Sequence, residues 1–416
     1  MKKMSENTFR MAGEFEELET VIVGWPRLIE PVKGVFPEGT VHEIVRNLIG
    51  HVKNVVINCG WPGSAARCKE MLTEGGISLD DVTITEIPDK MHWTRDYGPD
   101  IIGNDKGEKK CVHFRFDMYG MGEEDSAMSI MCKKFAPHMA IELGCYDMVG
   151  STLISEGGDK EFNGAGVMMA VEDTEVRKRN SDKTKEEVEE EFKRIFNLKK
   201  IIWLPYSTWE DEESTIGVLD YVDGKPVYRA GSANGHCDEF ARFVDKSTVL
   251  LLEISEEEAN SLESARITKE RCDMAYEVLK NSTDAEGNPI KILRIPAPIP
   301  EYVVTTPADW QNRTWGKRFS DNGDNLLDDG TPSPEGEIIL QPAQSYVNYL
   351  VCNDIVIAQC YWQPGKSEAI RKRDEEAMSV LAKAYPGRKI VPVYAMSLNL
   401  SGGGGIHCLT KNIAKY

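Results

Sequence analysis

The chain has 416 residues, of which 41% are hydrophobic and 28% are charged, as in a folded globular protein with a sizeable core. Lysine and arginine total 49 against 68 aspartate and glutamate residues, which gives a formal net charge of −19. This balance disfavours nucleic acid and anionic membranes as partners, because both attract positively charged surfaces, and it favours a cationic ligand.

The N-terminal segment has two lysines but no apolar stretch after them, so it does not indicate a cleaved secretory signal. No apolar run approaches the length of a membrane span. The 10 cysteines are scattered without a C-x-x-C pair, which speaks against a zinc site and against a disulfide scaffold. We therefore expect a cytoplasmic protein with free thiols.

Three apolar segments near the start of the chain have the pattern of strands, at residues 20–25, 52–58 and 83–87. A helical pattern at residues 41–49 separates the first two strands. The third strand opens into residues 91–99, a segment with several polar and aromatic side chains. Functional residues often lie on such loops.

The middle of the chain continues the alternation of strands and helices. Residues 156–166 predict a strand, a turn and a second strand, with Glu156 directed into a cavity. No helical pattern follows their glycines, so they do not form a dinucleotide-binding motif. Thr184 and Glu187 form a capping box at the start of an amphipathic surface helix, and a strand follows at residues 201–204.

A strand at 249–254, a helix at 256–280 and a strand at 290–295 repeat this order, which predicts one α/β architecture built from similar units. Two irregular segments, 206–235 and 310–337, interrupt it and are typical of functional loops or insertions. The first contains an acidic run at 210–213. The second contains a frame at 324–335 whose residues do not match a calcium-binding loop, so calcium is not expected there.

Two segments carry residues suited to catalysis. If the backbone around residue 237 is extended, His236 and Asp238 share one face and Cys237 lies on the other. A histidine beside a carboxylate can act as a general acid or base, although a purely structural pair is equally consistent with this pattern. Four glycines precede His407 and Cys408, and glycines permit close approach of a ligand. Cys408 is thus either a nucleophile or a small buried hydrophobic residue.

Four motifs occur in the order found in one enzyme family, and they are Trp93-x-Arg95-Asp96-x-Gly98-Pro99, Glu156-Gly157-Gly158, Gly235-His236-x-Asp238 and Gly403-Gly404-Gly405-Ile406-His407-Cys408. The chain resembles the family that joins agmatine deiminases with the bacterial type of peptidylarginine deiminase. The resemblance implies the pentein fold, a five-bladed α/β propeller. It also implies a single catalytic domain over residues 1–416, with loop insertions at 206–235 and 310–337.

The resemblance assigns the catalytic roles to Cys408, His236, Asp238, Asp96 and Glu156. It implies that the two aspartates hold a planar guanidinium, that the thiolate attacks its carbon, and that the histidine, supported by the glutamate, protonates departing ammonia. Substrate binding is assigned to Trp93, Arg95, Asp96, Asp238, Gly404 and Gly405. Neither a metal nor an organic cofactor is implied. His407 is interpreted as structural, because on an extended chain it points away from the thiol.

The expected partner is a small cationic guanidine, and related enzymes are commonly homo-oligomers. Agmatine, which would give N-carbamoylputrescine and ammonia, is favoured because the net charge and the acidic run at 210–213 suit a dication. Peptidyl-arginine or free arginine is the first alternative. An amidinotransferase and a binding protein without catalysis are the others. Gly13, Gly405 and Lys411-Asn412 depart from the family pattern and leave the substrate open.

Overall fold

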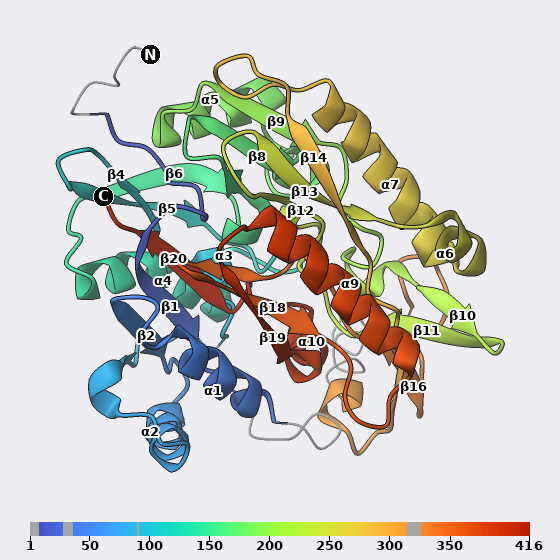
Figure 1. The fold of residues 1–416 in the computed structure, drawn as a ribbon. Coiled ribbons are helices and arrows are strands. Elements are labelled where there is room, and N and C mark those ends of the chain that lie inside the picture. The colour runs from blue at the N-terminus through green and yellow to red at the C-terminus, as the bar shows by residue number, and fades with distance from the viewer. Residues whose placement is uncertain (1–7, 28–35, 90, 314–325) are drawn as a thin grey trace.

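The computed structural model describes residues 8–27, 36–89, 91–313 and 326–416 (Figure 1). Within these residues the chain forms a mixed α/β fold with six small sheets. Five of the sheets share one plan, in which two antiparallel strands are followed by a helix and a third strand that runs parallel to the second. The similar units predicted from the sequence are therefore present.

The first unit joins β20 (Thr410–Ala414), β1 (Leu18–Gly24), α1 (Pro37–Leu48) and β2 (Asn54–Asn58), and is extended by α2 (Ser64–Glu74) and β3 (Thr83–Thr85). The second unit contains β4 (Asp100–Gly103), β5 (Lys109–Arg115), α4 (Ala127–Glu142) and β6 (Met148–Ile154), and the third contains β7 (Glu161–Phe162), β8 (Val167–Val171), α5 (Lys185–Phe196) and β9 (Lys200–Leu204). The fourth contains β12 (Ala241–Phe243), β13 (Thr248–Glu253), α6 (Glu256–Ser261), α7 (Glu263–Lys280) and β14 (Lys291–Pro296). The fifth contains β17 (Leu350–Cys352), β18 (Ile355–Cys360), α9 (Glu368–Ala384) and β19 (Lys389–Tyr394).

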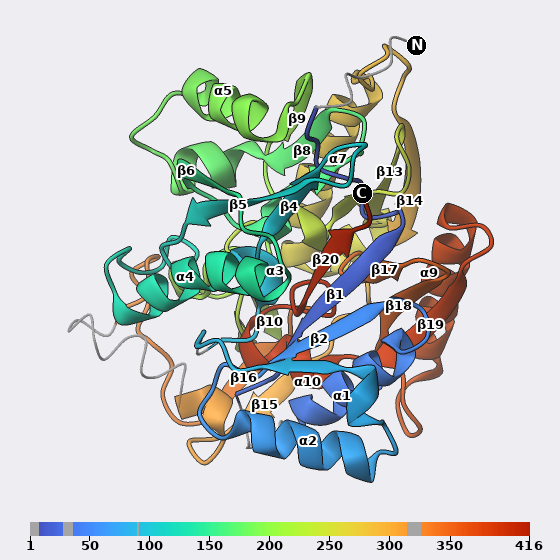
Figure 2. The same ribbon diagram turned by 90° about the vertical axis from the view of Figure 1, so that its left-hand side faces the viewer.

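The two ends of the chain meet in the first unit. β20 pairs antiparallel with β1, with Val23 opposite Thr410, and the two strands lie side by side in Figure 2. Apolar side chains bury β1 on both faces, as expected for a strand between two neighbours. The pairing places Cys408, just before β20, beside the short helix α3 (Thr94–Tyr97), where the backbone N–H of Arg95 donates to the Cys408 carbonyl at 3.1 Å.

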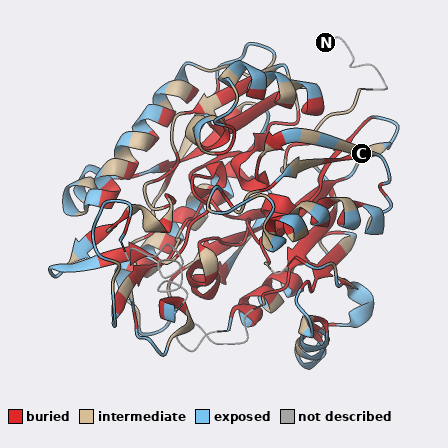
Figure 3. Cartoon of the chain, turned by 180° about the vertical axis from the view of Figure 1, so that it is seen from behind, coloured by how far each residue is buried: buried red, intermediate tan, exposed pale blue. Residues whose placement is uncertain are grey.

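The outer helices cover the sheets through one apolar face, and Figure 3 shows that their remaining surface is exposed while the strands are mostly buried. In α5 the predicted capping box of Thr184 and Glu187 is present. Phe192 and Phe196 are buried on its inner face, and each ring centroid lies 6.0 Å from that of Phe114 on β5. Replacing either phenylalanine by alanine would cost about 3–5 kcal/mol of stability, because it leaves a cavity.

The sixth sheet corrects the prediction that residues 206–235 are irregular, and its other two strands flank the segment 310–337. Its order is β10 (Asp220–Val222), β11 (Lys225–Arg229), β16 (Ile338–Gln341) and β15 (Val303–Thr305). β10 and β11 thus form a hairpin inside the first segment. Residues 314–325 of the second segment, including the start of the frame that was judged unsuited to calcium, lie outside the described residues.

Six predicted strands, at 20–25, 52–58, 83–87, 201–204, 249–254 and 290–295, are confirmed to within two residues at each end. The strand, turn and strand predicted at 156–166 are displaced, because residues 157–159 form a 3-10 turn, β7 has two residues and β8 begins at Val167. The helix predicted at 256–280 is wrong in one respect, since it is broken at Leu262 into α6 and α7. The Asp220 carboxylate on β10 accepts hydrogen bonds from the first backbone N–H groups of α7, at 3.1 Å from Glu263 and 3.3 Å from Ser264. α7 therefore starts at a cap supplied by a strand that is distant in the sequence. The sequence around residue 262 does not reveal this cap.

Among the described residues, no helix combines the length and the apolar character that crossing a membrane requires.

Candidate active site

The catalytic side chains predicted from the four motifs meet in one buried cluster. Each motif lies in a different connection between sheets. The backbone N–H of Gly158 donates to Asp96 Oδ1 at 3.0 Å. His236 Nδ1 lies 3.6 Å from the same oxygen, and Cys408 Sγ lies 3.6 Å from Asp238 Oδ2. The sequence motifs therefore describe one place in the fold.

His236 lies between two carboxylates and is completely buried. Its Nδ1 is 3.6 Å from Asp96 Oδ1, and its Nε2 is 3.5 Å from Glu156 Oε2. Burial by itself would lower the pKa of His236, but Asp96 and Glu156 outweigh it and raise the pKa to about 10. The ring is thus an imidazolium at neutral pH and is ready to donate a proton.

Glu156 is kept ionised by a buried arginine. Both of its oxygens accept hydrogen bonds from Arg179 Nε, at 3.0 and 2.9 Å. Burial would raise the pKa of Glu156, but the Arg179 guanidinium and His236 lower it to about 2. Arg179 Nη2 also donates to the Ala233 carbonyl at 3.1 Å, on the loop that leads to His236. The sequence gives no signal for Arg179, because it lies in a charged stretch read there as surface.

The pKa values of Asp96 and Asp238 are shifted in opposite directions. Burial raises the pKa of Asp96 to about 6, although the neighbouring His236 charge opposes the shift. Burial also acts on Asp238, but a hydrogen bond and charge interaction with His407 outweigh it and lower the pKa. Both carboxylates lie within 4 Å of His236 or Cys408. Two such groups can grip the planar donor face of a guanidinium.

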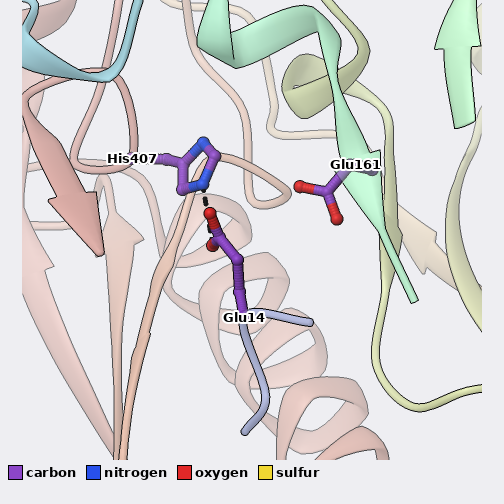
Figure 4. Close-up of side chains that lie close together, drawn as sticks. All are labelled: Glu14, Glu161 and His407. Carbon is purple, nitrogen blue, oxygen red and sulfur yellow. Dashed lines mark hydrogen bonds and ion pairs between the residues drawn. The ribbon is translucent and has the colours of Figure 1, made fainter. Parts of the chain in front are cut away.

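His407 has a structural role, as predicted, but it exercises this role inside the site by contacting Asp238. Its Nδ1 lies 2.6 Å from Asp238 Oδ2, and its Nε2 lies 2.9 Å from Glu14 Oε2 (Figure 4). The prediction assumed an extended chain, whereas residues 406–409 form a turn that precedes β20. His407 is therefore a positioning residue for one of the two aspartates.

Arg95, expected to bind substrate, is used for support as well. It forms an ion pair with Glu14 and donates to the Asn412 side chain at 2.9 Å. Its Nε also donates to the His407 carbonyl at 3.3 Å. The guanidinium is thus held on the side chains and backbone that carry the turn at residues 406–409, and every partner is separated from it by at least 81 residues.

Among the residues that the structure describes, two groups of side chains have donors close enough for a metal ion. Glu14, Glu161 and His407 form one, and Asp238, Glu239 and Cys408 form the other. In the first, Arg242 pairs with Glu14 at 2.5 Å and also with Glu161, so an arginine already supplies positive charge. The second contains the candidate nucleophile and an aspartate suited to a guanidinium.

The Cys408 thiol is buried among hydrogen-bonding groups. Asn348 Nδ2 donates to Sγ at 3.0 Å, and Glu239 Oε1 lies 3.9 Å away. Burial and the charges of Asp238, Glu239 and Asp96 raise the pKa of Cys408 well above its ordinary value. The thiol is therefore protonated in the absence of substrate. A cation placed between the aspartates would favour the thiolate.

Asn348 is not among the site residues predicted from the sequence. Its Oδ1 accepts the backbone N–H of His407 at 2.9 Å and that of Cys408 at 3.4 Å. Its Nδ2 also donates to Glu239 Oε1 at 2.8 Å. Asn348 thus fixes both the backbone and the sulfur of the nucleophile.

Gly404 and Gly405 allow close packing around the thiol. A Cβ on Gly404 would lie 2.9 Å from both the Trp93 ring and the Cys408 Cβ. A Cβ on Gly405 would lie 2.4 Å from the Gln359 amide nitrogen. No larger residue fits either position without displacing a neighbour. Both glycines therefore allow the chain next to Cys408 to pack closely against its neighbours. Trp93 lines a cavity.

That cavity, which we call the front cavity, has a volume of about 540 Å³. Trp93, Tyr119 and residues 400–402 line it. Glu213 and Trp310, from the segments 206–235 and 310–337, line it as well. Tyr119 donates to Asp96 Oδ2 at 3.0 Å, so the cavity reaches a member of the cluster. A volume of several hundred cubic ångströms accommodates a small organic molecule.

The acidic run at 210–213 is mostly structural, which corrects its interpretation as a field for the substrate. The Asp211 carboxylate accepts backbone N–H groups from Ala233, Gly235 and His236, at 2.7, 3.1 and 2.7 Å. Glu212 forms ion pairs with Lys178 and Arg271, at 2.7 and 2.5 Å. Glu213 is the member of the run that lines the front cavity.

The backbone around Cys237 also differs from the prediction, because residues 237–239 form a 3-10 turn instead of an extended segment. His236 and Asp238 still reach the same cluster. Cys237 lies in a separate part of the core, with its Sγ 3.3 Å from the Ala241 carbonyl.

Comparisons with known proteins agree with this geometry. A curated relative from Latilactobacillus sakei is 27% identical over 417 residues, with 97% of this chain and 96% of the relative aligned, and one from Marinomonas is 29% identical, with 97% and 94% aligned. Both are provisionally named agmatine deiminases. The solved agmatine deiminase of Enterococcus faecalis has the same fold, with a TM-score of 0.73, 24% identity and 98% and 96% of the two chains covered. The model of the Porphyromonas-type peptidyl-arginine deiminase family matches residues 10–413, and the chain therefore belongs to that family.

Proposed function

We propose that this protein is a hydrolase that removes one nitrogen of a guanidinium as ammonia, and that its substrate is agmatine, which becomes N-carbamoylputrescine. The observation that carries the proposal is the position of the Cys408 thiol, 3.6 Å from Asp238 and 3.0 Å from Asn348, in the cluster that contains Asp96 and the His236 imidazolium. These groups match the charge, the shape and the reaction of a guanidinium.

In the first half-reaction the guanidinium lies between Asp96 and Asp238, and its positive charge favours ionisation of Cys408, whose proton passes to solvent. The thiolate forms a bond with the guanidinium carbon. His236 donates its proton to the departing nitrogen, the C–N bond breaks, and ammonia leaves. A thiouronium remains on the sulfur.

In the second half-reaction His236 is neutral and accepts a proton from water. The resulting hydroxide adds to the thiouronium carbon, and the C–S bond breaks with its electron pair passing to sulfur. The hydroxyl proton of the adduct passes to that sulfur, which restores the Cys408 thiol. The product carries a ureido group. Glu156, ionised beside Arg179, stabilises the imidazolium that exists before the first proton transfer and after the second.

The choice of agmatine draws on the names of the relatives and on Glu213. This half-buried carboxylate lines the front cavity, and among the described residues its side chain has no ion-pair partner. It is a suitable acceptor for the primary ammonium of agmatine. Arg27 lines the same cavity and favours a second candidate, free arginine, because it offers a cation to an α-carboxylate.

We further infer that the five similar units are the blades of an α/β propeller, with the catalytic cluster at their common centre. Each unit repeats the same strand order, and the cluster takes side chains from the connections of several units. Residues 1–416 then form one catalytic domain. The segments 206–235 and 310–337 shape the outer end of the front cavity through Glu213 and Trp310.

A substrate panel tests the proposal. Agmatine, free arginine and a peptidyl-arginine are compared by kcat/KM, with ammonia and ureido product measured in the same reaction. Agmatine is expected to be preferred, and Glu213→Gln to raise its KM about tenfold while leaving an alkylguanidinium that lacks the primary ammonium unaffected. Glu190→Gln, an equal change of charge on exposed α5, is the control. A higher kcat/KM for either arginine substrate would refute the choice of agmatine, and absence of ammonia from all three would refute the activity.

A further inference from the structure

A second cavity of about 540 Å³, which we call the rear cavity, lies beside residues 233–236. These residues, which include His236, are called the catalytic loop below. Leu252, Ile254, Ala265 and Ile299 give it apolar walls. Its lining also includes Asp211 and Glu239, which contact the catalytic cluster, and none of the residues that line the front cavity. The two cavities are therefore distinct.

The charged side chains that line the rear cavity are mostly acidic, with five carboxylates and one arginine. The arginine, Arg373, is already paired with Glu258 at 2.6 Å and donates to the Ala297 carbonyl at 2.5 Å. Glu210 forms a hydrogen bond with Thr268 on α7, and burial raises the pKa of its carboxyl. A cation beside Glu210 would restore the ionised carboxylate that burial disfavours.

Two buried polar groups in the same lining lack partners. Ser264 is 0% exposed and Gln341 is 7% exposed, and neither the Ser264 Oγ nor the Gln341 Oε1 has a hydrogen-bond partner among the described residues. Such groups are uncommon in folded proteins. Both atoms can accept hydrogen bonds, so a ligand with N–H donors and an apolar body fits the lining better than water alone.

We propose that the rear cavity binds a small amphipathic primary amine, with its ammonium at Glu210 and its carbon chain against Leu252, Ile254 and Ile299, and that the catalytic loop responds to its presence.

The response follows from two side chains shared by the cavity and the cluster. Asp211 accepts the backbone N–H groups of Ala233, Gly235 and His236, so it fixes the loop that carries the imidazolium. Glu239 accepts from Asn348 Nδ2, the group that also donates to the Cys408 sulfur. A ligand that restrains Asp211 restrains the loop.

Calorimetric titration of the Cys408→Ser protein with n-hexylamine tests binding, and saturating agmatine is included to fill the front cavity. Hexylamine is expected to bind under these conditions, whereas n-hexanol, which lacks the charge, binds at least about tenfold more weakly. Glu210→Gln should weaken hexylamine about tenfold or more, and Glu190→Gln should leave it unchanged. Loss of all binding when agmatine is present, or equal binding of hexanol, would overturn the assignment.

Amide hydrogen exchange provides the second readout, and it does not depend on activity. Hexylamine is expected to slow exchange at Ala233, Gly235 and His236 at least about threefold, because these N–H groups are held by Asp211. Ala265→Leu fills the cavity and should abolish this protection. If that variant is unfolded, Ile299→Ala, which reduces the apolar wall, is expected to weaken hexylamine binding. Unchanged exchange on ligand binding would refute the link to the loop.

Discussion

The pKa of Asp96 makes substrate binding depend on pH in a way that can be worked out. Burial raises it from the ordinary 3.8 to about 6, so ionising this carboxyl in the empty site costs about 3 kcal/mol more than in water. A guanidinium binds to the ionised form. Below pH 6, binding must therefore release a proton, and affinity falls about tenfold for each further pH unit.

Between about pH 7.5 and pH 4.5 this predicts a loss of affinity of about 30-fold. The other ionised groups of the cluster do not obscure it, because the pKa of Glu156 is about 2 and that of His236 is about 10. Agmatine binding to the Cys408→Ser protein is measured by calorimetry over this range, in two buffers of different ionisation enthalpy. Asp96 should release about one proton per bound ligand near pH 5 and almost none near pH 7.5.

The substitution Asp96→Asn should weaken binding at pH 7.5 by about 10- to 150-fold, the value of a hydrogen bond to a charged group. It should also remove the loss of affinity at low pH. Asp354→Asn deletes an exposed carboxylate that pairs with His51 and is the control for net charge. A flat affinity from pH 4.5 to 7.5, or a pH dependence that survives in Asp96→Asn, would refute the reasoning.

Three other outcomes are expected. Asn348→Ala should lower kcat about 10- to 100-fold with little change in KM, because it removes the donor at 3.0 Å from the Cys408 sulfur, and unchanged steady-state kinetics would contradict this. Arg179→Met should destabilise the fold by about 3–5 kcal/mol in urea unfolding, since it leaves Glu156 buried without its partner, and adding Glu156→Gln should recover part of that loss. Burial raises the pKa of Asp89 to about 7, so this group favours the folded state below about pH 4 and loses that contribution as the pH rises to 7. Asp89→Asn should therefore gain up to about 4 kcal/mol relative to the native protein between those pH values, and parallel stability curves for the two proteins would exclude this shift.

The strands and most helices were predictable because their signals are local. Apolar runs such as residues 20–25 form buried strands, and the capping box at Thr184 starts α5 where the pattern places it. The break at Leu262 was not predictable, because the group that caps α7 is Asp220 on a distant strand. Periodicity reports which face of one element is buried, but it carries no information about polar partners on another element.

The same distinction applies to the site. Motif order placed Asp96, His236 and Cys408 in one family pattern. The structure places His236 3.6 Å from Asp96 and Cys408 3.6 Å from Asp238. The partners of Arg95 and His407 could not be predicted, because Glu14 and Asp238 lie on different segments. Buried charges require such partners, and only the folded chain identifies them.

The central claim is that Cys408 forms a covalent bond to the guanidinium carbon, and intact-mass analysis of the trapped enzyme tests it most directly. His236→Ala removes the acid of the first half-reaction and the base of the second, and each step should slow by about 10²- to 10⁴-fold. The variant is therefore incubated with agmatine long enough for the intermediate to form slowly, and is then acid-quenched. The predicted result is an increase in mass equal to agmatine minus ammonia, located by peptide mapping on Cys408 and absent when Cys408→Ser is added to the variant. Ureido product formed with no such adduct, or an adduct that persists in the serine variant, would contradict the mechanism.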